Sequence, residues 1–117
     1  MTEARSPITS HVLDTTEGRP AHGMVVRLDV WTGDGSWARL AERVTDADGR
    51  ASDLLLPGAL VAGTYRVTFE TGGYFRASGR PTFYPRVEVV FEVVAPTEHH
   101  HIPLLLSPFG YSTYRGS

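Results

Sequence analysis

Cysteine and lysine are both absent from the 117-residue sequence. Without cysteine the chain can form no disulfide bond, no zinc–thiolate site and no thiolate nucleophile. Without lysine it can form neither a Schiff base with a substrate nor a lysine-dependent phosphate-binding loop. All 11 basic residues are therefore arginine, and they are interspersed with 13 acidic residues to give a formal charge of −2. Because no basic cluster is present to follow a phosphate backbone, we expect no nucleic-acid partner.

Long apolar runs are also missing. None approaches the roughly 20 residues that a membrane-spanning helix needs, and residues 1–10 lack the apolar core of a signal peptide. We therefore expect a cytoplasmic protein with no membrane partner. The length fits one domain, which we place at residues 7–117, after a disordered or flexible N-terminus at residues 1–6.

The dominant hydrophobic period is two residues, as in a β-strand, rather than the 3.6 residues of a helix. In residues 64–70, for example, Tyr65, Val67 and Phe69 alternate with polar side chains. Alternation of β-branched and aromatic residues predicts half-buried antiparallel strands. Short strands separated by glycine-containing turns predict an all-β sandwich of two sheets, with one short helix at residues 71–79. The predicted strands cover residues 7–14, 24–32, 37–45, 50–55, 64–70, 86–94, 99–107 and 110–115.

Three consecutive histidines open the predicted strand at residues 99–107. Alternate side chains of a strand share a face, so His99 and His101 point one way and His100 points the other way with Ile102. Two imidazoles on one face could bind a metal or act as a general base and its partner. Two are fewer than the three or four ligands of a zinc site. Composition alone favours the other interpretation, a polar start of a strand.

His11 and Arg50 each have a plain structural alternative. Alternation places His11 beside Thr9 and Leu13 in the first strand, where a lone histidine is usually structural. Arg50 follows the turn at residues 46–49 and could be a solvated turn residue. It could also offer its planar guanidinium to a carbonyl or an anionic oxygen. No local signal decides between these alternatives.

The C-terminal segment keeps an alternating pattern to the last residue. Phe109, Tyr111, Thr113 and Arg115 fall on one face of the predicted strand. Chain ends are commonly polar and frayed, so this pattern predicts a terminus that is held in place. The segment is either an ordered edge strand or a tail inserted into a site.

Several of these segments together resemble the transthyretin-like 5-hydroxyisourate hydrolases. They are Ile-Thr-Ser-His-Val-Leu-Asp at 8–14 with Gly-Arg-Pro-Ala at 18–21, Thr-Asp-Ala-Asp-Gly-Arg at 45–50, and residues 99–117. The terminal Tyr114-Arg115-Gly116-Ser117 is the signature of these enzymes and is missing from hormone-carrying transthyretins. The resemblance covers nearly the whole chain. Its departures are His100 and Phe109, which stand where the family more often has tyrosine.

The resemblance implies a transthyretin-like sandwich of two four-stranded antiparallel sheets and a homotetramer, built as a dimer of dimers. It also implies hydrolysis of 5-hydroxyisourate to 2-oxo-4-hydroxy-4-carboxy-5-ureidoimidazoline in urate degradation, without a metal or another cofactor. The implied catalytic residues are His11, Arg50, His101 and Ser117. The implied substrate-binding residues are His99, Tyr114, Arg115 and Gly116.

For the reaction we expect water to be activated by the pair His11 and His101, with His101 preferred as the base. An imidazole with its ordinary pKa of about 6.5 can accept and return a proton near neutral pH. Arg50 would hold developing negative charge, and Ser117 would position the substrate or the water. Three alternatives remain: a ligand carrier of the transthyretin type, a metal-binding sandwich that uses His99 and His101, and a generic immunoglobulin-like interaction domain.

Overall fold

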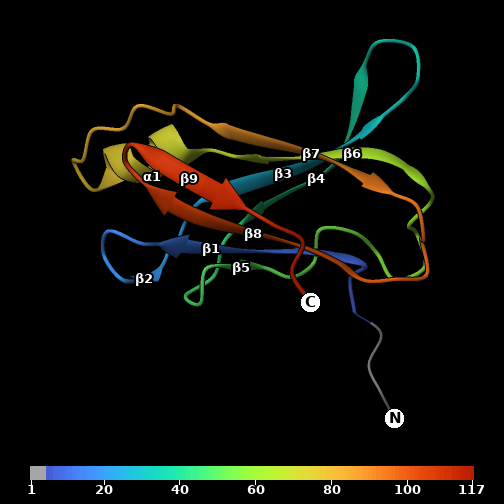
Figure 1. The fold of residues 1–117 in the computed structure, drawn as a ribbon, viewed down its shortest axis with the longest axis horizontal. Coiled ribbons are helices and arrows are strands. Elements are labelled where there is room, and N and C mark those ends of the chain that lie inside the picture. Colours follow the sequence, from blue (N-terminus) through green and yellow to red (C-terminus); the bar gives the residue numbers. More distant parts are fainter. Residues whose placement is uncertain (1–4) are drawn as a thin grey trace.

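Two β-sheets pack face to face, and loops and a short helix connect their strands (Figure 1). The computed structural model describes residues 5–117. Most of the segment predicted to be flexible falls on residues 1–4, which lie outside the described residues. Ser6 is buried, and its hydroxyl donates to the carbonyl oxygen of Ile8 at 2.6 Å and accepts from the backbone N–H of Leu55 at 3.0 Å. Residue 6 is thus already part of the packed structure.

The first sheet carries its strands in the order β2-β1-β8-β9, and β5 also pairs with β1. It has five strands where four were predicted. The predicted strand at 50–55 is only two residues long because β5 pairs with Ser10 and His11 alone, while β2 pairs with Leu13 and Asp14. The strands are β1 (Ile8–Asp14), β2 (Arg19–Pro20), β5 (Arg50–Ala51), β8 (His100–Ser107) and β9 (Gly110–Thr113).

Strands β1 and β8 run parallel, although antiparallel pairing was predicted throughout. The chain reaches β8 from β7 in the other sheet, so it crosses between the sheets before it pairs with β1. Parallel neighbours need such a crossover, and hydrophobic alternation carries no information about strand direction. The parallel register sets Thr9 opposite His101 and His11 opposite Pro103.

The second sheet is antiparallel, in the order β4-β3-β6-β7. Each of its strands begins and ends within one residue of the predicted boundary, because β3, β6 and β7 are alternating segments and β4 lies between the clear turns at residues 33–35 and 46–49. The strands are β3 (Val25–Trp31), β4 (Trp37–Val44), β6 (Gly63–Phe69) and β7 (Val87–Val93). The hairpin between β3 and β4 projects from the body of the molecule (Figure 1).

The helix α1 (Thr71–Ala77) confirms the predicted short helix despite its two glycines. Phe75 anchors it in the core. Gly72 lies directly against Pro85, because an added Cβ would meet the Pro85 carbonyl oxygen at 2.7 Å. Within residues 5–117, no helix is long and apolar enough to cross a membrane.

The core lies between the sheets, where the predicted alternation is confirmed. The buried face of β1 and β8 meets the buried face of β3 and β6, and each large buried side chain contributes about 1.5–3 kcal/mol relative to an exposed one. His100 faces this core and is 5% exposed, which confirms that it points away from His99 and His101. The central contributors are Val12, Leu104, Leu106, Val26, Leu28, Val67 and Phe69.

The terminal strand is shorter than predicted, because β9 ends at Thr113. Continued pairing in the same register would place Tyr114 opposite Pro103, and proline has no N–H to donate to the ladder. The Thr113 hydroxyl donates to the Pro103 carbonyl oxygen at 2.7 Å instead. Pairing then resumes in the original register as an isolated bridge between Gly116 and His101.

Candidate active site

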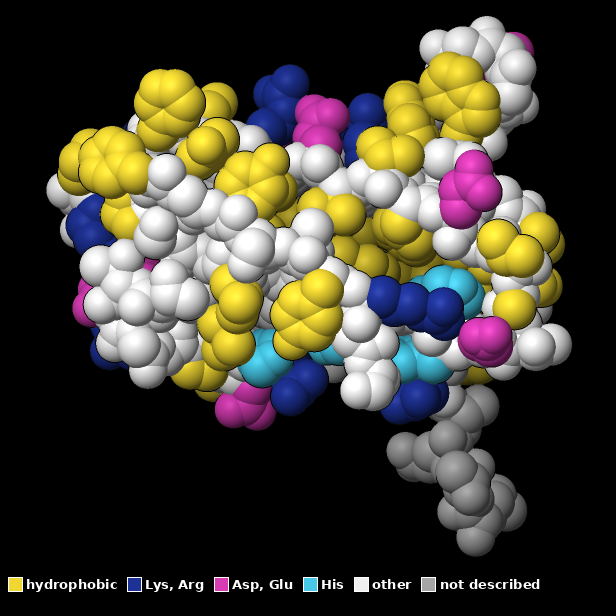
Figure 2. Space-filling model, viewed as in Figure 1, with side chains coloured by type: hydrophobic (Ala, Val, Ile, Leu, Met, Phe, Trp, Pro, Cys, Tyr) yellow, Lys and Arg dark blue, Asp and Glu magenta, His cyan; other side chains and the backbone are white. Residues whose placement is uncertain are grey.

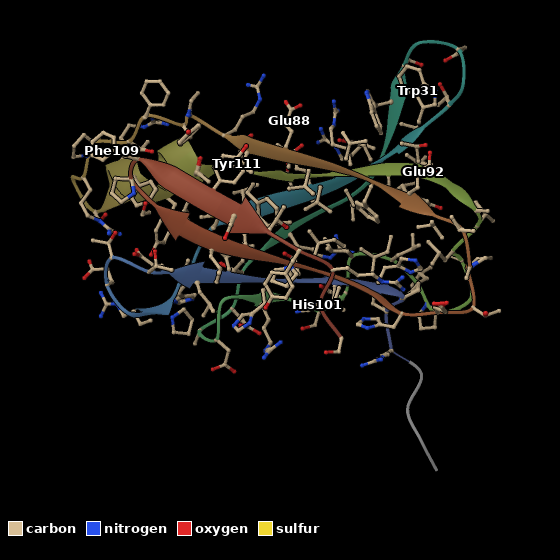
Figure 3. All side chains as sticks on the ribbon, viewed as in Figure 1. Trp31, Glu88, Glu92, His101, Phe109 and Tyr111 are labelled. Carbon is tan, nitrogen blue, oxygen red and sulfur yellow. The ribbon has the colours of Figure 1, made fainter. Side chains whose placement is uncertain are left out.

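Most of the predicted site residues gather on the outer face of the first sheet, away from the core. Thr9 and His11 belong to β1, in register with His101 and Pro103 of β8. His101 extends from β8 beside the C-terminal segment (Figure 3). Arg50 on β5 is the cross-strand neighbour of His11. Three strands from distant parts of the sequence therefore supply the candidate side chains.

The hydroxyl of Thr9 joins two histidines. Its Oγ1 lies 3.0 Å from Nε2 of His99 and 2.8 Å from Nδ1 of His101. The two imidazole rings are nearly parallel, with an interplanar angle of 17° and centroids 6.2 Å apart. The strand pattern predicted that His99 and His101 share a face, and the geometry confirms it.

A tight turn holds Arg50 beside His11. The backbone N–H of Arg50 donates to Oδ1 of Asp46 at 3.0 Å, and this bond is the main reason that the pKa of the Asp46 carboxyl is lowered. Gly49 has a φ of 75° and packs against the backbone of Val12. A side chain at position 49 would therefore push the turn away from β1.

His11 is oriented by the same turn, because its Nε2 lies 2.8 Å from the carbonyl oxygen of Asp48. A carbonyl oxygen only accepts hydrogen bonds, so Nε2 must carry the proton. In the neutral ring Nδ1 is then unprotonated and can accept a proton.

The two histidines that contact Thr9 favour the neutral state. Burial, followed by the positive charge of Arg50 and then by His11, lowers the pKa of His101. Burial, followed by the charge of Arg5, lowers the pKa of His99. A lowered imidazole pKa leaves both rings neutral at neutral pH, each with one nitrogen that is able to accept a proton.

The C-terminal tail, residues 114–117, runs from β9 across β8 (Figure 1) and bridges to His101. The N–H of Gly116 donates to the His101 carbonyl oxygen at 2.9 Å. An added Cβ on Gly116 would lie 2.5 Å from Cδ2 of the His101 ring. The Arg115 guanidinium donates to the His99 carbonyl oxygen at 3.3 Å and to the Glu98 carboxylate at 3.4 Å.

These contacts bring Ser117 to a polar depression of about 230 Å³ at the foot of the tail. Strand alternation had placed Thr9 on the face of His11, but only the parallel register of β1 and β8 places it between two imidazoles. Arg5 and Ser52 gave no signal in the sequence. The depression is lined by Arg5, Thr9, Ser10, Arg50, Ser52, His99, His101 and Ser117.

Tyr114 and Arg115 lie on the other side of the tail. Together with His101 they line a largely apolar groove that also includes Phe91 and Ile102. Figure 2 shows this groove as a hydrophobic hollow beside basic and histidine side chains. Within one chain, His101 therefore borders both cavities, whereas Tyr114 and Ser117 border different ones.

The side chains around His99 and His101 are a poor set of ligands for a metal ion. Among the described residues 5–117, no group of three or more histidine, aspartate or glutamate side chains is placed to hold one. His99 and His101 are instead connected through the Thr9 hydroxyl.

Comparisons with known proteins agree on one family. The model of the HIUase/Transthyretin family matches residues 8–116. A 5-hydroxyisourate hydrolase from Mus musculus is 45% identical over 118 residues, which span 100% of both chains. One from Salmonella typhi is 44% identical over 110 residues, or 94% of this chain and 80% of the relative.

Solved structures give the same fold. The 5-hydroxyisourate hydrolase of Klebsiella pneumoniae has a TM-score of 0.82 and 37% identity, and covers 98% of this chain and 100% of that one. Sea bream transthyretin in complex with thyroxine has a TM-score of 0.89 and 37% identity, and covers 94% of each chain.

Proposed function

This chain belongs to the HIUase/transthyretin family, and we propose that it hydrolyses 5-hydroxyisourate to 2-oxo-4-hydroxy-4-carboxy-5-ureidoimidazoline in urate degradation. The family holds both hydrolases and thyroxine-binding transthyretins, so backbone similarity alone does not choose between them. The choice depends on the side chains of the site.

The position of the tail carries the proposal. The bridge from Gly116 to His101 puts Ser117 into one depression with two histidines and Arg50. A carrier needs only a cavity of suitable shape, whereas hydrolysis needs a proton acceptor and a stabiliser of negative charge. Neutral imidazoles and a guanidinium supply both.

In the proposed reaction His101 removes a proton from water as the water oxygen attacks the carbonyl carbon of the cyclic amide. The carbonyl oxygen gains negative charge, which the Arg50 guanidinium stabilises. The carbon–nitrogen bond then breaks, and the leaving nitrogen takes up the proton from a protonated histidine. Each proton removed is returned, so no oxidant, reductant or cofactor is required.

The other residues position the reactants. His11 offers an unprotonated Nδ1 on the same face and can share the proton transfer. Ser117 orients the substrate or the water through its hydroxyl or its terminal carboxylate. We assign substrate binding to His99, Tyr114, Arg115 and Gly116.

A homotetramer, built as a dimer of dimers, would complete the site. In a single chain Arg50 is exposed to water. A neighbouring subunit that excluded this water would strengthen the electrostatic stabilisation that Arg50 provides. Strands β7 and β9 each have one unpaired edge, and such edges are templates for a second copy. Val90 in β7 and Tyr114, which follows β9, are each 58% exposed. Light scattering after size exclusion should give four times the monomer mass, and a monomer at assay concentrations would contradict this assembly.

The proposed activity is tested by following the ultraviolet absorbance of freshly generated 5-hydroxyisourate with and without the protein. We expect the protein to accelerate the decay, and treatment with a chelator to leave the rate unchanged. No acceleration, together with saturable thyroxine binding, would favour the carrier instead. The cytoplasmic location remains a prediction that cell fractionation can check.

A further inference from the structure

Thr9 has one hydroxyl proton and two imidazole neighbours. A hydroxyl can donate one hydrogen bond and accept two. It can therefore donate to His99 or to His101, but not to both at once. Since both rings favour the neutral state, each also carries a single N–H proton.

Only two arrangements satisfy both hydrogen bonds and use the hydroxyl proton. In the first, Thr9 donates to Nδ1 of His101 and accepts from Nε2 of His99, so both rings carry their proton on Nε2. In the second, Thr9 donates to Nε2 of His99 and accepts from Nδ1 of His101, so both rings carry their proton on Nδ1. If both rings donated to Oγ1, the hydroxyl proton would have no acceptor among the described residues.

Within the described part of the chain, no other hydrogen bond opposes this coupling. Nδ1 of His99 is buried and has no partner among residues 5–117. Nε2 of His101 also makes no hydrogen bond to a described residue, but it is not among the fully buried unpaired atoms. Among residues 5–117, Thr9 is therefore the only hydrogen-bond partner that can select the tautomer of either ring.

We propose that Thr9 is a positioning residue that couples the tautomers of His99 and His101. The accessible Nε2 of His101 is then a free proton acceptor only in the arrangement in which His99 carries its proton on Nδ1. After His101 accepts a proton on Nε2, its Nδ1–H continues to donate to Thr9, and this bond stabilises the imidazolium. The catalytic consequence rests on the proposed hydrolase function, whereas the coupling itself does not.

The coupling is measured directly by ¹⁵N NMR of histidine-labelled wild-type protein. At about pH 8.5, roughly two units above the ordinary imidazole pKa, the ¹⁵N shifts report the tautomer of each ring. We expect His99 and His101 to show equal fractions of the Nδ1–H form. Opposite tautomers on the two rings would overturn the proposal without any use of a variant.

Thr9→Val removes the hydroxyl at nearly constant shape, and Thr9→Ser is the matched control that keeps it. We expect the valine variant to lose the equality of tautomers. We also expect kcat to fall about 10- to 100-fold, as for other residues that orient an imidazole, with KM changed less than about twofold. The serine variant should retain both properties. An equal loss in both variants would mean that the methyl group matters, and would overturn the proposal.

The pH profile separates positioning from packing. Loss of the Thr9 acceptor should lower the pKa of His101 further, so the acid limb of kcat should move to lower pH in Thr9→Val and stay in place in Thr9→Ser. The groups around His101 that also influence this limb are His11, Arg50, Arg5, His99 and the terminal carboxylate of Ser117. They are the same in both variants.

The proposed hydrolase function and the proposed tautomer coupling can be refuted independently. If the wild-type protein does not accelerate decay of 5-hydroxyisourate but the tautomers are equal, the coupling stands and the hydrolase function falls. If the protein is active and the tautomers are unequal, the function stands and the coupling falls.

Discussion

The outer faces of the two sheets differ in how completely their charged and polar side chains are paired. On the second sheet, Asp29 is 2% exposed and accepts hydrogen bonds from Arg39 at 2.7 Å and from Arg66 at 3.0 Å. Arg27 binds Glu42 and Glu70 in the same manner. Each buried charge there is neutralised within the chain, so the network is complete.

The outer face of the first sheet is left incomplete. The Arg50 guanidinium makes no ion pair or hydrogen bond with any residue in 5–117, and the accessible nitrogen of His101 makes no hydrogen bond to these residues either. Burial and a neighbouring cation keep the imidazoles neutral. Paired charges stabilise a fold, whereas unpaired donors and neutral bases can act on a ligand. Mutations in the two faces should therefore have separable effects.

The largest expected effect is on activity, from His101→Asn. Loss of the general base should lower kcat by about 10²- to 10⁴-fold, while the urea midpoint stays close to that of the wild type. His22→Asn, at an exposed histidine, is the control and should retain activity. A fully active His101→Asn enzyme would remove this residue from the mechanism.

The next effect is on stability, from Asp29→Ala. Removal of the buried carboxylate takes away the shortest ion pair of each of two guanidinium groups, and should lower the free energy of unfolding by about 2 kcal/mol, with little change in kcat. Asp53→Ala removes an exposed ion pair to Arg43 at 3.2 Å and should cost less than about 0.5 kcal/mol. Equal losses of stability in the two variants would show that the buried ion pairs of Asp29 stabilise the fold no more than the exposed pair of Asp53.

Gly116→Ala should produce a smaller, local effect. The new Cβ would collide with the His101 ring, so the tail must shift, and we expect kcat to fall about 10-fold, as when an orienting contact is lost. Gly110→Ala is the control, because its Cβ would meet only the Ser107 hydroxyl at 3.7 Å. The urea midpoint should change little in either variant, and wild-type activity of Gly116→Ala would refute a role for the tail.

The smallest effect is on the pKa of His101 in Arg50→Gln, and it is separate from the fall in kcat expected when the charge-stabilising guanidinium is removed. The cation lowers the pKa of His101, so its removal should raise that pKa, and solvent screening at the exposed arginine weakens the effect. NMR titration of His101 gives the value directly. Arg86→Gln, in an exposed ion pair on the second sheet, should leave the titration unchanged. A pKa that falls in Arg50→Gln would reverse the assigned sign.

The sequence predicts the second sheet better than the first, for a physical reason. Alternating segments define β3, β6 and β7 locally, turns on both sides delimit β4, and the pairs β3–β4 and β6–β7 join successive strands of this sheet. Alternation also separated His100 from His99 and His101. It could not join Thr9 to His101, because that contact depends on the parallel register across a crossover. The link from His11 and Arg50 to this pair came only from the family resemblance.

Pro103 has a further consequence for motion. Pro103 lacks the N–H that would continue the hydrogen-bond ladder between β8 and the chain after Thr113. The ladder of β9 therefore ends before residues 114–117, which are held by other contacts. The tail can then lift from His101 by breaking the Gly116 bridge and the Arg115 contacts, without unzipping β9. We expect the Gly116 amide to exchange with deuterium through this local opening, much faster than amides whose exchange requires global unfolding. A route into and out of the site would thus be present in the native ensemble.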